Sequence, residues 1–71
     1  MVYLGWHDPN PRIKTVDKLA AAITRYTEKF GAAPAHALVN HSHAADLANA
    51  EIEVRTVAHI PPNTFFVGDP E

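Results

Sequence analysis

Two histidines two positions apart, followed by an aspartate, are the residues of this chain best placed to do chemistry. They lie in the run Asn40-His41-Ser42-His43-Ala44-Ala45-Asp46. Imidazole nitrogens and carboxylate oxygens are common zinc ligands, and imidazoles spaced this way in a turn can reach one ion. The spacing therefore predicts, as one alternative, a zinc site made by His41, His43 and Asp46. A histidine elsewhere in the chain would supply a fourth ligand.

The same run resembles the His-x-His-x-Asp-His signature of the metallo-β-lactamase superfamily, which also follows a strand and opens a helix. His41 and His43 match the first two histidines, which bind one zinc ion in that superfamily. Ala45 stands at the aspartate position and Asp46 at the last histidine position, so the ligands of the second zinc ion are missing. Because the superfamily fold needs a far longer chain, the resemblance implies one metal site at most and no membership.

The backbone of this run favours a different kind of site. If residues 35–40 form a parallel strand, their carboxyl end is where open α/β sheets bind ligands. The amides that follow Ser42 would then form a helix N-terminus, which attracts anions. The candidate anion-binding residues are Asn40, His41, Ser42 and His43. No glycine-rich turn accompanies them, which argues against a nucleotide-binding motif.

Catalytic chemistry has little support elsewhere in the chain. There is no cysteine, and the only serine, Ser42, has its two histidines as direct neighbours, an arrangement that does not form a triad. The paired carboxylates of Glu51 and Glu53 are expected on one exposed strand face. A chain this short also has difficulty enclosing a pocket that excludes water. We therefore predict that the protein is not an enzyme.

One long helix is expected to support these residues. An apolar stripe recurs at steps of three and four residues and is formed by Val16, Leu19, Ala20, Ile23, Tyr26 and Phe30. This pattern predicts a helix over residues 15–30. We expect Thr15 to cap its N-terminus, Gly31 to end it in the left-handed conformation, and Pro34 to prevent its continuation.

Short strands and one further helix are expected around it. Residues 2–6 and 35–40 read as strands, Ser42 is expected to cap a short helix that ends near Asn49, and residues 51–57 and 64–67 read as strands again. The sequence thus predicts a single small α/β domain over residues 1–71, with α+β as the alternative. Its single-layer sheet has about four strands, in the order strand, helix, strand, short helix, strand, strand, with helix 15–30 on one face.

Large aromatic side chains are expected on both faces of that sheet. Phe65 and Phe66 are consecutive and point to opposite faces of a strand, and Tyr3 and Trp6 also fall on opposite faces. One helix cannot cover both faces, and burial of one phenylalanine is worth about 2 kcal/mol. We therefore predict a homodimer with Tyr3, Trp6, Phe65 and Phe66 in or beside its interface.

The C-terminal half also resembles the closing part of tailed-phage major capsid subunits. The matching runs are Leu38-Val39-Asn40, the pair Val54 and Val57, and residues 60–69, with Asn63 where that family prefers glycine. The resemblance implies an assembly or interaction role and supports the order of the strands.

Composition narrows the function further. The net charge of −2 argues against a nucleic-acid partner, and no apolar run is long enough for a membrane span. The absence of cysteine fits the cytoplasm. We predict a non-enzymatic interaction module that self-associates, without a cofactor and with either a second copy or another protein as its partner. The alternative is a His-dependent zinc-binding protein.

Overall fold

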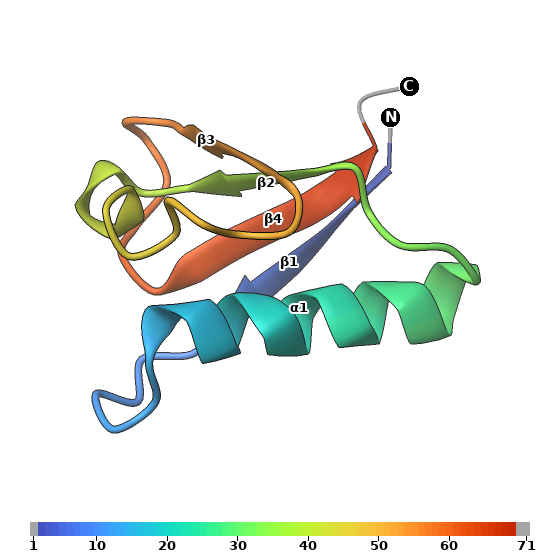
Figure 1. Cartoon of the computed structure of the whole chain (residues 1–71), viewed down its shortest axis with the longest axis horizontal. Coiled ribbons are helices and arrows are strands. Elements are labelled where there is room, and N and C mark those ends of the chain that lie inside the picture. The colour runs from blue at the N-terminus through green and yellow to red at the C-terminus, as the bar shows by residue number, and fades with distance from the viewer. Residues whose placement is uncertain (1, 70–71) are drawn as a thin grey trace.

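The chain folds into a four-stranded mixed sheet with one long helix on one of its faces (Figure 1). The computed structural model describes residues 2–69. Its elements, in chain order, are strand β1 (Val2–His7), helix α1 (Thr15–Phe30), strand β2 (His36–Val39), the short 3-10 helix η1 (His41–His43), strand β3 (Glu53–Thr56) and strand β4 (Thr64–Asp69). The predicted fold class, and the position of the long helix on one face, are confirmed.

The strands lie in the order β1-β4-β2-β3, so the last strand of the chain is central. It pairs antiparallel with β1 on one side and with β2 on the other, whereas β3 pairs parallel with β2. Strands β1 and β2, which α1 connects, therefore run in the same direction but are separated by β4. Strands β1 and β3 form the two edges of the sheet.

Helix α1 ends as expected and begins differently. Gly31 follows its last turn in the left-handed conformation, with φ 78°, and its N–H donates to Thr27 O. The prediction that Thr15 caps the N-terminus is wrong: Lys14 is the N-cap and makes no side-chain capping bond. The Thr15 hydroxyl instead donates to Asp46 Oδ2 at 3.3 Å, which ties the helix start to a loop.

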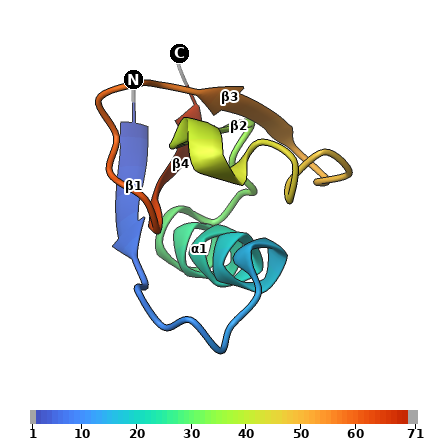
Figure 2. The same ribbon diagram turned by 90° about the vertical axis from the view of Figure 1, so that its left-hand side faces the viewer.

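The core lies between the sheet, α1 and the segment over residues 44–52 (Figure 2). Its buried members are Leu19, Ala22, Tyr26, Ala37, Val39, Leu47, Phe65 and Val67. Three residues of the predicted stripe are exposed: Val16 (45%), Phe30 (43%) and Ala20. Val16 and Phe30 lie in the terminal turns of α1, whereas Leu19, Ala22 and Tyr26 pack into the core.

The expected short helix over residues 42–49 is absent. Only His41–His43 form a 3-10 helix, and turns follow it, held mostly by bonds from each N–H to the carbonyl three residues earlier. The expected cap is also wrong, because Asn40 is the N-cap and its side chain accepts the N–H of Ser42. The Asn40 cap and the hydrogen bonds to the carbonyl three residues earlier wind the chain more tightly than the four-residue spacing of an α-helix.

Candidate functional site

The two histidines that the sequence singles out have different surroundings. His43 is 8% exposed, and its ring stacks on Phe65 with 5.6 Å between centroids. Its Nε2 accepts the backbone N–H of Asn63 at 2.8 Å. Because a backbone N–H can only donate, this bond requires an unprotonated Nε2 and places the proton of the neutral ring on Nδ1. His41 and Ser42, by contrast, are exposed.

Asn63 joins three parts of the chain at this point. Its own backbone has φ 63°, a conformation that asparagine tolerates better than most residues. Its carbonyl accepts the N–H of Asp8, and its side-chain oxygen accepts a bond from Lys18 Nζ at 2.9 Å. Lys18 is 3% exposed on α1. The His43–Asn63–Lys18 cluster therefore connects η1, the turn before β4 and the helix.

These contacts define what the predicted site residues do. Asn40 caps η1 and also donates through Nδ2 to Ile60 O at 2.6 Å, and Asp46 accepts from Thr15. The polar groups of Asn40 and His43 thus bond to the chain itself. Among residues 2–69, no three side chains of the metal-ligating types come together. These bonds make the segment at the carboxyl end of β2 a structural junction, and its 3-10 helix has three residues.

The aromatic residues divide between the two faces of the sheet as the alternation predicts. Phe65 is fully buried on the face that α1 covers, and Trp6, its partner across the β1–β4 pair, lies partly buried on that same face. Tyr3 and Phe66 lie on the opposite face, where the structure has no helix among its described residues. Of the four predicted interface residues, Tyr3 and Phe66 therefore face outward, and Phe65 belongs to the core.

The uncovered face carries an apolar patch, formed by Tyr3, Leu38, Ile60, Pro61 and Phe66. These side chains, with His59, line a shallow hollow of about 380 Å³. Tyr3, Leu38 and Phe66 are half-buried, Pro61 is exposed, and Ile60, which lies in the loop that leads to β4, is 4% exposed. This apolar patch is the candidate functional surface of the molecule.

Gly5 lets the Phe66 ring lie close to β1. The two residues are opposite each other in the β1–β4 pair, and a Cβ built on Gly5 would lie 3.1 Å from Phe66 Cε1. The ring thus occupies the space that a side chain at position 5 would need. This packing keeps Phe66 partly covered by the chain itself and fixes its place in the apolar patch.

Charged residues occupy the other end of this face. Glu53 Oε2 accepts from Arg55 Nε and lies 3.3 Å from His36 Nε2. The hydrogen bond from Arg55 is the main cause that holds the pKa of Glu53 below its usual value of 4.5, with a smaller contribution from His36. Glu53 and Arg55 are exposed, as the alternation in this strand predicts. The face therefore has an apolar half near β1 and a charged half near β3.

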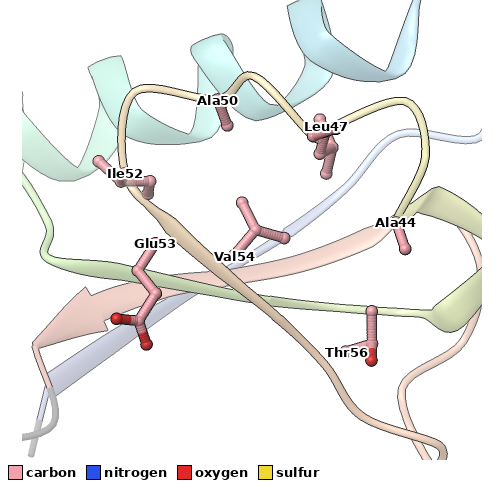
Figure 3. A pocket seen from close by; sticks show the side chains of 8 residues that line it. Ala44, Leu47, Ala50, Ile52, Glu53, Val54 and Thr56 are labelled. Atoms are coloured by element: carbon pink, nitrogen blue, oxygen red, sulfur yellow. The ribbon is translucent and has the colours of Figure 1, made fainter.

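A second hollow lies on the covered side, between the turns over residues 44–50 and strand β3 (Figure 3). It has a volume of about 310 Å³, and its apolar lining includes Leu47, Ile52 and Val54. Glu53 and Thr56 also line it, but the Glu53 carboxylate points away from the hollow (Figure 3) and bonds to Arg55 on the other face of the sheet. The Thr56 hydroxyl is the other polar side-chain group among the lining residues.

No helix among residues 2–69 has the length and apolar character needed to cross a membrane. Comparison of the chain with known protein families, with curated proteins and with solved structures finds no match.

Proposed function

We propose that the protein is a small non-enzymatic interaction module that self-associates. The observation that carries this proposal is the unequal cover of the sheet. Helix α1 and the segment over residues 44–52 pack on one face, whereas the other face presents the apolar patch around Tyr3, Leu38 and Phe66. Partly exposed apolar side chains grouped on a face that no helix covers are typical of a contact surface.

The size of the chain supports the same proposal. A domain of 71 residues with no cysteine has a small core and no disulfide to stabilise it. Partly exposed aromatic side chains leave hydrophobic stabilisation unused, and a second copy recovers it with one self-complementary surface. The net charge of −2 opposes such association only weakly.

The proposal includes no cofactor, nucleic acid or membrane. Its support is the low net charge and the engagement of His43 and Asp46 by other residues. We also propose a cytoplasmic location, supported by the absence of cysteine, since small secreted domains commonly rely on disulfides.

The molar mass of the untagged chain in solution tests this function. Sedimentation equilibrium across the micromolar range is expected to give twice the chain mass of 7.8 kDa, with a fall towards one chain mass on dilution. Phe30→Lys is a control, because Phe30 is an exposed aromatic residue that lies on α1, outside the apolar patch. We expect this variant to dimerise like the parent. A single chain mass at every concentration would contradict the proposed function.

A further inference from the structure

The two edges of the sheet differ in how well they are protected from pairing with another strand. Natural edge strands are kept apart by shortness, charged side chains, proline or bulges. Strand β3 has four residues and carries Glu53 and Arg55. Strand β1 has six residues, Val-Tyr-Leu-Gly-Trp-His, with no proline, no acidic residue and no lysine or arginine, and its pairing with β4 is continuous. The edge at β1 has none of these protections.

The hydrogen bond that follows the last pair of β1 and β4 shows which way the backbone groups of β1 point. Asp8 N–H donates to Asn63 O, so Asp8 faces β4. Along an antiparallel strand, residues face the two sides alternately. Leu4 and Trp6 therefore bond to β4, and the N–H and C=O groups of Tyr3, Gly5 and His7 point to the outer edge.

The rest of the chain leaves that edge open. Within residues 2–69, no turn, loop or cap gives a backbone hydrogen bond to Tyr3, Gly5 or His7. Gly5 is exposed even though the Phe66 ring lies close over the position of its missing side chain. Since Phe66 covers Gly5 from one face of the sheet, the open edge accounts for this exposure.

We infer that β1 pairs antiparallel with β1 of a second copy, across a two-fold axis at Gly5. This inference rests on the proposed self-association and specifies its geometry. Tyr3 of each copy lies opposite His7 of the other, and the two Gly5 residues lie opposite each other. The Tyr3–His7 pair occurs twice by symmetry and the Gly5–Gly5 pair once, which makes three pairs. Each pair exchanges two backbone hydrogen bonds, so that every outward-facing N–H and C=O group from Tyr3 to His7 is used. An axis at Leu4 would pair Tyr3 with Gly5 and leave His7 without a partner among residues 2–69.

Side chains fit this register on both sides of the joined sheet. On the side of α1, Leu4 of one copy lies opposite Trp6 of the other, so that two large apolar groups meet. On the uncovered side, the two apolar patches become neighbours, because Tyr3 lies in β1 itself. Strand β1 contains no Asp, Glu, Lys or Arg, and its His7 lies opposite Tyr3 of the other copy, so like charges do not oppose each other in these pairs.

Tyr3→Pro and Tyr3→Ala together test the edge. Both remove the Tyr3 ring, but only proline removes the outward N–H, and neither removes a bond to β4. Sedimentation equilibrium is expected to show Tyr3→Ala as a dimer. Tyr3→Pro should dimerise roughly tenfold more weakly or worse, because symmetry removes the bond twice.

The outcomes separate this inference from the proposed function. A monomeric parent would overturn both. A dimeric parent with equal Tyr3→Pro and Tyr3→Ala affinities would overturn the edge pairing and leave self-association standing. If Tyr3→Pro is unfolded by circular dichroism, a synthetic chain with N-methylglycine at position 5 replaces it. That residue blocks the outward N–H of Gly5 without placing a Cβ against Phe66, and a dimer as tight as the parent would refute the inference.

Discussion

Replacing His43 with phenylalanine removes the nitrogen that accepts the Asn63 N–H while it keeps an aromatic ring against Phe65. In the parent chain the bond is 2.8 Å long and His43 is 8% exposed, so water cannot readily replace the lost acceptor. A buried donor left without a partner costs about 1–3 kcal/mol. The ring contact with Phe65 is retained, and the loss therefore reports mainly on the hydrogen bond.

The expected effect is large for so small a domain. A cost of about 2 kcal/mol corresponds to a fall of about 8–16 °C in Tm for a chain of this length. His43→Gln is the matched variant, because the glutamine side-chain oxygen can reach the place of Nε2 and accept the same N–H. We expect His43→Gln to recover part of the stability that His43→Phe loses.

Thermal unfolding followed by circular dichroism, at one protein concentration for all three chains, measures the difference. Equal concentrations are needed because self-association raises the apparent Tm. A His43→Phe chain as stable as the parent, or a His43→Gln chain less stable than His43→Phe, would refute the structural role given to His43.

Three further predictions concern other parts of the chain. Gly31→Ala should cost about 1 kcal/mol, because the φ of 78° at position 31 strains a residue with a Cβ, while that Cβ meets no other atom within 4 Å; the Tm measures the loss. Since the Arg55 hydrogen bond lowers the pKa of Glu53 in the folded chain, its stabilisation is complete above the usual pKa and is lost as the pH falls through the folded value. Arg55→Gln should therefore lower Tm at neutral pH and approach the parent in acid, and an equal difference at every pH would contradict this. Zinc titration of the untagged chain should find no stoichiometric binding, and His41→Ala should keep the parent stability within about 0.5 kcal/mol.

Much of the fold can be predicted from local patterns. The apolar stripe and Gly31 locate α1 to within a residue, and period-two alternation places Phe65 and Phe66 on opposite faces. The position of β4 between β1 and β2 cannot be found this way, because strand pairing depends on contacts distant in sequence. The residues after His43 were misassigned because alanine favours helices, whereas tertiary bonds hold this segment in tighter turns.

The roles of the candidate site residues are harder to predict than their types. His43 and Asp46 have the chemistry of metal ligands, but their partners, Asn63 and Thr15, lie 20 and 31 residues away along the chain. One local signal was present: Asn63 follows two prolines at the end of a connection, a typical place for a left-handed residue. The buried contact of Lys18 with Asn63 had no such signal, since lysine on a helix is normally exposed.

Amide hydrogen exchange of β1, resolved by residue and repeated at several protein concentrations, tests the central claim most directly. The amides of Leu4 and Trp6 bond to β4 and should be protected at every concentration. Those of Tyr3, Gly5 and His7 should exchange quickly in dilute protein and slow down together as the dimer forms. Rapid exchange of these three amides in a sample that is dimeric by mass would contradict the pairing of β1 with its copy.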